Sequence, residues 1–247
     1  MKRIYVSVLT IVIYGLAQFL PTIAQAMGLL STENTTDLMK QSINLQLFSF
    51  IVAAILILLF QTQIKNPMQF ELTPKEPKRY IVPWVLAGLG VVFIAQLIIN
   101  AISTLLFGID PASQNTLALM KIAREMPIFI ILIAIVGPIL EEYVFRKVIF
   151  GELYNAIQAK PIVKFLIAGI VSSILFALAH MDFTHFLVYF AMGIIFSAFY
   201  IYTKRLSVAI GIHIAQNGLV TLVQLLIPEQ VFERMLEETQ VIILHLF

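Results

Sequence analysis

The stretch EEYVFR, residues 141–146, stands inside one of the most apolar parts of the chain. It is preceded by PIFIILIAIVGPIL (127–140) and followed, after Lys147, by VIF (148–150). Two adjacent carboxylates and a guanidinium at membrane depth cost at least a few kcal/mol, so a functional role is the default interpretation. The nature of that role depends on what surrounds them.

The rest of the chain has the composition of a membrane protein. Hydrophobic residues make up 60% of the 247 residues and charged residues 12%, about half the charged fraction of a soluble domain. Runs of roughly 20 apolar residues recur, and that length crosses a bilayer core. The sequence therefore predicts an all-α fold, a polytopic membrane helical bundle. The chain has no cysteine, which excludes thiol catalysis and thiolate metal sites, and no basic stripe suggests a nucleic-acid partner.

Seven apolar segments are expected to cross the bilayer, at 4–29, 44–63, 80–106, 127–150, 161–181, 184–203 and 205–227. The polar connections are expected to be loops or interfacial helices, at 31–41, 63–79, 108–127 and 203–205. The tail 228–247 mixes apolar and acidic residues at helical spacing, which favours an interfacial helix over an eighth span. We expect one membrane domain over 1–247. Its first segment is too long for a cleaved signal peptide.

Lysine and arginine placement predicts the orientation of these spans. With the N-terminus inside, eleven of the 16 Lys and Arg residues fall on the cytoplasmic side and four outside, leaving Arg146 aside. The N-terminus is therefore expected to be cytoplasmic. Because no organelle signal is visible, the lipid bilayer concerned is expected to be a bacterial cytoplasmic membrane.

A few polar side chains fall within or at the ends of the apolar segments. Glu142 and Arg146 are four residues apart with the acid first, which is the favourable order for an ion pair on a helix. Glu141 points about 100° away from Glu142, so it stays free for chemistry. The alternative is that all three form a structural salt-bridge cluster.

Two further segments bring polar side chains into the apolar part. His213 and Asn217, in GIHIAQN (211–217), share one helix face, although hydrogen bonding between helices could also explain them. His180 ends VSSILFALAH (171–180), one turn after Phe176. Two other histidines are interpreted as helix-end or interfacial residues, His185 and His245.

The motifs Glu-Glu-x-x-x-Arg at 141–146, Phe-x-x-x-His at 176–180 and His-x-x-x-Asn at 213–217 occur in this order. They resemble those of the CPBP family of intramembrane proteases, which joins type II CAAX prenyl endopeptidases to bacteriocin-processing and self-immunity proteins. The likeness covers residues 125–220, the expected catalytic core. It implies an intramembrane endopeptidase whose site residues have the following roles: Glu141 and His180 activate a water, His213 and Asn217 bind the oxyanion, and Glu142 and Arg146 hold the geometry.

The chemistry leaves two mechanisms open. A buried carboxylate whose pKa approaches neutrality can deprotonate water, and a His with an Asn can stabilise the oxyanion, without a cofactor. Alternatively, Glu141, His180 and His213 could supply the three protein ligands of a catalytic zinc. The metal-free mechanism is favoured, because no HExxH helix occurs and Asn217 suits an oxyanion site better than zinc.

A simple topology separates two of these residues in depth. His180 falls near the outer end of its span, and Glu141 falls on the cytoplasmic side of the centre if its span ends at Lys147. At about 1.5 Å per residue the separation exceeds about 10 Å. We therefore expect a long fourth helix that continues through Leu153 and is kinked at Pro138. The alternative is a broken or shifted span before His180.

Two other functions compete with the protease. Buried Glu and His also occur in proton-coupled transporters, but the chain has no repeat and no paired broken helices. A non-catalytic scaffold or bacteriocin-immunity-type peptide binder is the other alternative. For a protease, the expected partner is a small peptide or a membrane-tethered protein. Prenylated CAAX peptides, bacteriocin or pheromone precursors and membrane-protein tails are all compatible.

Overall fold

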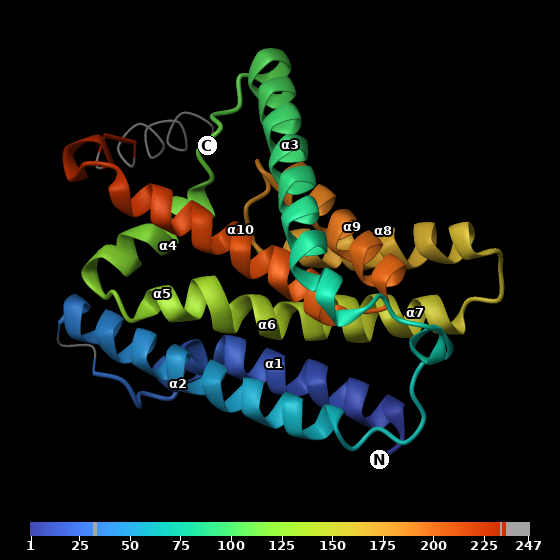
Figure 1. Ribbon diagram of the computed structural model, residues 1–247. Helices are drawn as coiled ribbons and strands as arrows, with labels where there is room; N and C mark the ends of the chain where they lie inside the picture. Colours follow the sequence, from blue (N-terminus) through green and yellow to red (C-terminus); the bar gives the residue numbers. More distant parts are fainter. Residues whose placement is uncertain (32–33, 233, 236–247) are drawn as a thin grey trace.

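The computed structural model describes residues 1–31, 34–232 and 234–235, and the regular elements in this part of the chain are helices (Figure 1). The expected all-α fold is thus confirmed. Two helices, α1 (Arg3–Ala26) and α2 (Thr35–Gln61), form an antiparallel hairpin along one side of the molecule. Asn34 caps α2 by accepting a hydrogen bond from the Thr36 N–H at 2.9 Å. Because of this cap, α2 includes most of the segment 31–41 that was expected to be a connection.

The next long helix lies on the opposite side of the bundle from this hairpin (Figure 1). After the short 3-10 turns η1 (Gln69–Leu72) and η2 (Lys78–Tyr80), α3 (Ile81–Phe107) crosses its neighbours steeply in Figure 1. It ends at Gly108, whose φ of 66° is left-handed and suits glycine. The amphipathic α4 (Gln114–Glu125) follows within the segment expected to be a loop or interfacial helix.

The segment that carries EEYVFR is a continuous helical run made of five pieces. These are α5 (Phe129–Ile131), the π-helix η3 (Leu132–Val136), α6 (Gly137–Glu141), the π-helix η4 (Glu142–Phe150) and α7 (Gly151–Ala156). The expected continuation through Leu153 is confirmed. The run crosses the middle of the molecule without a sharp bend in Figure 1. The expected kink at Pro138 instead takes the form of the π-helical turn before it, because this turn accommodates a residue that has no N–H.

The last three helices agree with the expected segments. They are α8 (Pro161–Ala179), α9 (Phe186–Thr203) and α10 (Leu206–Leu226). Beyond α10, residues 229–232 are helical. The rest of the expected interfacial helix, 236–247 with His245, lies outside the described residues.

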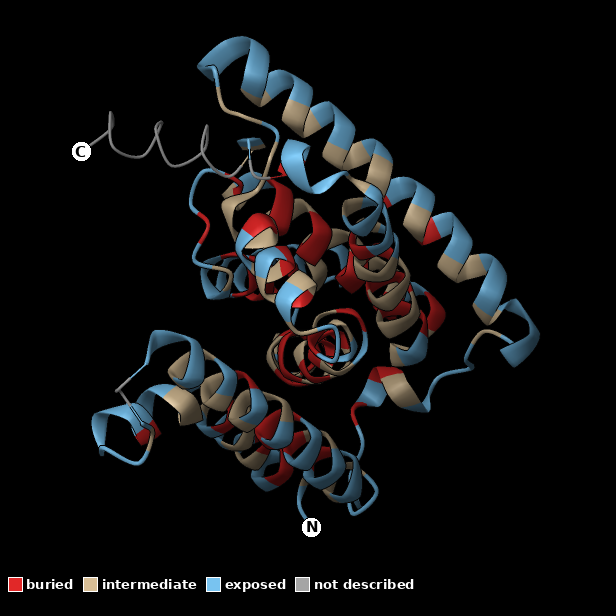
Figure 2. Ribbon diagram, turned by 90° about the vertical axis from the view of Figure 1, so that its left-hand side faces the viewer, coloured by how far each residue is buried: buried red, intermediate tan, exposed pale blue. Residues whose placement is uncertain are grey.

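Within the described residues, six helices are long and apolar enough to cross a membrane: α1, α2, Lys78–Phe107, α8, α9 and α10. The polytopic membrane bundle is therefore confirmed, but its expected seven or eight spans are not. The expected fourth segment, 127–150, is helical but is divided into short α and π pieces that carry four charged residues. It lies at the centre of the bundle, where buried residues are concentrated in Figure 2.

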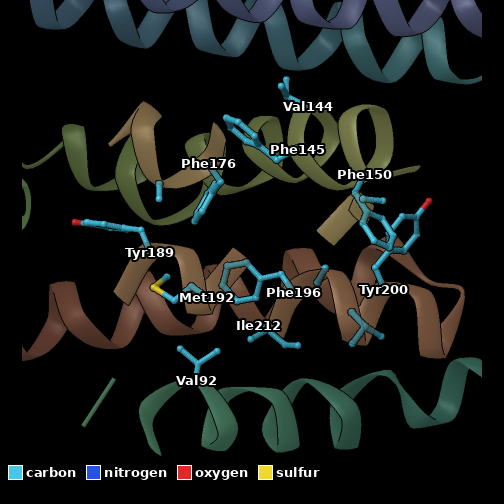
Figure 3. Packing of buried hydrophobic residues seen from close by; sticks show 14 of the residues in the cluster. Val92, Val144, Phe145, Phe150, Phe176, Tyr189, Met192, Phe196, Tyr200 and Ile212 are labelled. Carbon is cyan, nitrogen blue, oxygen red and sulfur yellow. The ribbon is translucent and has the colours of Figure 1, made fainter. Parts of the chain in front are cut away.

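Two apolar clusters enclose the run. Its first half contributes Phe129, Leu132 and Leu140 to a cluster shared with α1, α2 and α4. Its second half contributes Phe145 and Phe150 to a cluster shared with α3, α8, α9 and α10 (Figure 3). EEYVFR therefore lies where the two clusters meet.

The contact between α8 and α9 generates a prediction about stability. A Cβ on Gly193 would lie 2.7 Å from the Ser173 Cβ and 2.9 Å from its Cα, which is too close without a backbone shift. We expect Gly193→Ala to lower the free energy of unfolding by about 1–2 kcal/mol, because overpacking outweighs the gain in helix propensity. The measurement is thermal unfolding in detergent, with an expected fall of about 2–4 °C.

Gly90→Ala on α3 is the matched control, because a Cβ there meets no atom within 4 Å. Its melting temperature should stay unchanged or rise slightly. An equal fall in both variants would contradict the close contact between α8 and α9.

Candidate active site

The buried ion pair within EEYVFR is formed as expected. Glu142 and Arg146 are one turn apart, their side chains are both 0% exposed, and Arg146 Nε lies 3.2 Å from Glu142 Oε2. Removing either charge would leave the other unpaired in a low-dielectric interior. The pair therefore needs surroundings that compensate both ends.

Aromatic rings surround the guanidinium end of the pair. The Arg146 Cζ lies 4.1 Å from the ring centroid of Phe176, 5.0 Å from that of Phe196 and 5.9 Å from that of Phe145. Figure 3 shows these three phenylalanines close together between the run and α9. Such faces attract a cation electrostatically, most strongly where water is excluded. This contact gives the Phe176 of the second motif a definite structural role.

His213 occupies the carboxylate end of the pair. Its Nδ1 lies 2.9 Å from Glu142 Oε1, and its Nε2 lies 3.7 Å from Glu141 Oε2. The ring also stacks on Phe196, with centroids 4.9 Å apart. The two adjacent glutamates thus meet opposite nitrogens of one imidazole. Glu142 is fully buried, whereas the Glu141 side chain is 21% exposed.

A hydrogen bond from Asn217 links α10 to the π-helical turn. Gly137 N–H donates to the carbonyl of Leu132, five residues back, so the next acceptor in that pattern is the carbonyl of Ile133. Its donor would be the N–H of Pro138, which does not exist. Asn217 Nδ2 donates to the Ile133 carbonyl instead, at 2.9 Å. One of its two amide hydrogens is used in this way, and the second is left for other partners.

His180 follows directly after α8 and is held on two sides. Its Nδ1 lies 2.8 Å from the carbonyl oxygen of Phe176, which only accepts, so Nδ1 carries the proton and Nε2 is the free nitrogen. The ring stacks on Tyr189 of α9, with centroids 4.1 Å apart and planes 24° apart. These contacts fix both the tautomer and the orientation of His180.

The four residues expected to be catalytic line one cavity of about 700 Å³. They are Glu141, His180, His213 and Asn217. Glu141 on the central run and His180 at the end of α8 thus reach the same cavity, despite the difference in depth that a simple topology predicts. Glu142 and Arg146 lie behind the cavity wall, because both are fully buried and neither lines the cavity.

A zinc ion would need free ligand atoms on Glu141, His180 and His213. Among the described residues, no group of three or more His, Cys, Asp or Glu side chains is arranged so that it could hold a metal ion. His213 also has its Nδ1 on Glu142 and its Nε2 towards Glu141, and His180 has its Nδ1 on a carbonyl. The three suggested ligands do not fit a zinc ion in this arrangement, so no step is derived through one.

A second polar cluster, which the sequence did not indicate, borders the cavity beside His180. His185 was interpreted as a helix-end residue; it does precede α9, but it is buried and lines the cavity. Its Nδ1 lies 3.2 Å from Asp182 Oδ1 and its Nε2 lies 3.0 Å from the carbonyl of Asp110. Asp182 Oδ2 accepts from Ser113 Oγ at 2.7 Å, and Ser113 Oγ lies 3.0 Å from the Tyr189 hydroxyl. The cluster therefore supports the ring that stacks on His180.

The two charged members of this cluster shift each other's pKa. Burial alone would raise the pKa of Asp182, but hydrogen bonds from His185, Thr184 and Ser113 outweigh it and hold that pKa well below its usual range. Burial would likewise lower the pKa of His185, but Asp182 and the carbonyl of Asp110 raise it above the usual value. Both ring nitrogens face acceptors, which is the environment that a protonated imidazole needs.

Local sequence signals for the remaining contacts are weak. Phe196 and Tyr189 lie within the apolar segment 184–203, where aromatic residues are ordinary. Asp182 could have been found as an acid close to His180 and His185 in AHMDFTH (179–185). Its partner Ser113 lies 69 residues away, so the cluster itself is a tertiary feature.

The buried ion pair leads to a prediction about paired substitutions. Arg146→Met removes the cation and leaves Glu142 uncompensated, so it should lower the free energy of unfolding by about 3–5 kcal/mol. The double variant Glu142→Gln/Arg146→Met leaves no buried charge of the pair and should recover most of that loss. Denaturant unfolding in detergent measures both. A double variant as unstable as the single one would show that the charge pairing is not what stabilises this region.

The cluster at His185 leads to a pH-dependent prediction. A histidine whose pKa is raised by folding stabilises the fold at every pH below its pKa in the unfolded chain, which is about 6.5. This contribution is lost as the pH rises through the pKa of the histidine in the folded protein. An aspartate whose pKa is lowered by folding stabilises the fold at every pH above its pKa in the unfolded chain, which is about 3.9. This contribution is lost as the pH falls through the pKa of the aspartate in the folded protein. The pair therefore contributes most between about pH 4 and 6.5.

His185→Gln should accordingly lower the melting temperature by about 2–4 °C at pH 6 and by less at pH 9. Thermal unfolding of both proteins across that range makes the comparison. A difference that does not vary with pH would mean that the histidine charge plays no part.

Comparisons with known proteins identify the family of the chain. The family model of type II CAAX prenyl endopeptidase Rce1-like proteins matches residues 123–219. The chain is 50% identical to the membrane-embedded CAAX protease MroQ of Staphylococcus aureus (strain USA300), over 93% of each chain. It is 39% identical to the putative membrane peptidase YdiL of Bacillus subtilis (strain 168), over 66% of this chain and 65% of that one. No solved structure matches. The chain is therefore an integral membrane protease and belongs to the Rce1-like family of CAAX proteases.

Proposed function

We propose that the protein is an intramembrane endopeptidase in which Glu141 activates the attacking water. The observation that carries this proposal is the difference between two adjacent carboxylates. Glu142 is closed off by Arg146 and His213, whereas Glu141 reaches the cavity that His180, His213 and Asn217 also line. A paired, buried carboxylate suits a structural role, and a cavity-lining one beside a free imidazole nitrogen suits acid–base chemistry.

The reaction divides into two proton transfers at Glu141. A water held between Glu141 and His180 Nε2 loses a proton to the Glu141 carboxylate while its oxygen bonds to the carbonyl carbon of the substrate. The protonated Glu141 then gives that proton to the amide nitrogen as the carbon–nitrogen bond breaks. Water is added across one peptide bond, and the carboxylate is restored.

The oxyanion is stabilised from α10. The second amide hydrogen of Asn217 is one donor, and its position is set by the first hydrogen on the Ile133 carbonyl. His213 is the other donor, through Nε2, when its ring is protonated and donates Nδ1 to Glu142. No metal ion is required for these steps.

The substrate is a peptide or a membrane-tethered protein that reaches the cavity from the bilayer. The relative from Staphylococcus aureus is named for CAAX proteolysis, and a prenylated tail is one compatible substrate beside bacteriocin or pheromone precursors. The distribution of Lys and Arg supports a cytoplasmic N-terminus. Both relatives are bacterial, so the cytoplasmic membrane of a bacterium is the proposed location.

The test uses purified protein in detergent, incubated with the peptide fraction of its own membranes and followed by mass spectrometry. Glu141→Gln and His180→Ala should each lower the cleavage rate by about a hundredfold or more, since Glu141 transfers the protons and His180 holds the water. Asp37→Asn is the control, because Asp37 is an exposed acid of α2 remote from the cavity lining and should keep full activity.

A strong chelator should leave cleavage by the wild type unchanged. Loss of cleavage that zinc restores would instead make Glu141, His180 and His213 metal ligands. A folded wild type that releases no product absent from the Glu141→Gln sample would favour the peptide-binding scaffold.

A further inference from the structure

Carboxamide side chains line the active-site cavity from four membrane-spanning helices. They are Gln18 of α1, Gln46 of α2, Gln96 and Asn100 of α3, and Gln216 and Gln224 of α10. Gln96 and Asn100 are four residues apart on one face of α3, and α3 packs against α10. The wall formed by α3 and α10 thus presents amide groups over more than one helical turn, beside His213.

Several of these amides have little to bind within the protein. Gln216 is only 6% exposed, and its Oε1 has no hydrogen-bond partner among the described residues. The same holds for the buried Oε1 of Gln224. Gln96 Nε2 reaches the sulfur of Met192 at 3.2 Å, which is a weak acceptor. Unpaired amides at membrane depth are costly, so a ligand in the cavity would stabilise them once their side chains turn towards it.

The chemistry of the lining decides which ligand fits. A carboxamide offers an acceptor and two donors, which match the C=O and N–H of a peptide unit. Among the described lining residues there is no Lys or Arg, and the carboxylates of Asp110 and Glu141 would repel a lipid phosphate. A helical peptide pairs its own backbone groups and has no need of such partners. An unwound peptide segment does need them.

Hydrolysis also requires that the substrate be unwound near the bond that is cleaved. A carbonyl inside a helix is hydrogen-bonded and covered, so the scissile bond has to be unwound before water attacks. In a bilayer, each backbone group freed by unwinding costs several kcal/mol unless it finds a partner. A wall of carboxamides beside the catalytic residues supplies those partners at the position where they are needed.

Building on the proposed function, we propose that the wall of Gln96, Asn100 and Gln216 binds the substrate next to the scissile bond as an unwound backbone segment. The substrate class is therefore a membrane-associated peptide that is non-helical, or easily unwound, near the cleaved bond. The cavity volume of about 700 Å³ is within the range of sites that enclose a small ligand or a short stretch of chain.

The experiment measures binding, so that it does not depend on cleavage. The probes are two fluorescent Leu/Ala-rich peptides of about 20 residues. One carries Gly-Gly-Pro at its centre and the other Ala-Ala-Ala. Their binding to Glu141→Gln protein in detergent is followed by fluorescence anisotropy. Added on that background are Gln96→Leu, Asn100→Leu and, as the matched control, Gln25→Leu, which removes an exposed carboxamide outside the cavity.

We expect the Gly-Gly-Pro peptide to bind about tenfold more tightly than the helical one. Gln96→Leu and Asn100→Leu should each remove most of this preference, and Gln25→Leu should keep it. Each variant is first shown to be monodisperse with an unchanged melting temperature, and either wall variant suffices if the other fails to fold. Equal binding of both peptides, binding of neither, or a preference that survives both wall variants would overturn the proposal. If the preference is found but the wild type cleaves nothing, the catalytic proposal fails and this one stands.

Discussion

A guanidinium buried inside a membrane bundle needs a compensating charge, and Arg146 has one carboxylate beside it and three aromatic rings around it. Its own helix supplies Glu142, and neighbouring helices supply Phe176, Phe196 and, through Glu142, His213. These contacts fix α8, α9 and α10 relative to the central run. Glu141, next to the pair, is thereby placed at the cavity and outside the direct contact between Glu142 and Arg146.

The backbone of the run is distorted where it carries these residues, and its neighbours compensate. Asn217 of α10 donates to the carbonyl of Ile133, and Ser172 of α8 donates to the carbonyl of Phe145 at 2.6 Å. In a membrane, a carbonyl released from regular helical bonding needs such a partner. The π-helical turns are thus held by the same helices that carry the second and third motifs. Local irregularity and the site geometry therefore have a common origin.

The sequence predicted those parts of the fold that depend on local pattern. Apolar length gave the membrane helices, and the four-residue spacings gave the Glu142–Arg146 pair and the shared face of His213 and Asn217. The need to bring Glu141 and His180 to one depth predicted the long central helix. The π-helical turns were not predicted, because their hydrogen-bond shift depends on donors from other helices. For the same reason, the central segment fell outside the six regular spans.

Contacts between distant segments account for the remaining differences. The role of His185 depends on Asp110 and Ser113, which lie in the connection between α3 and α4. Tyr189 and Phe196 gain their roles only through the rings and cations that pack on them. The glutamines of the cavity gave no signal in the sequence, because single amides in apolar segments are unremarkable until several helices bring them to one wall.

The position of His213 between two glutamates has a consequence for electroneutrality. With its ring protonated, Glu141, Glu142, Arg146 and His213 sum to zero formal charge. In the proposed mechanism, transfer of a proton from water to Glu141 would only redistribute charge between the cluster and the bound substrate, and the enclosed region would stay neutral. A change at any one of these positions that alters its charge leaves a net charge in a medium of low dielectric. The four residues thus behave as one electrostatic unit.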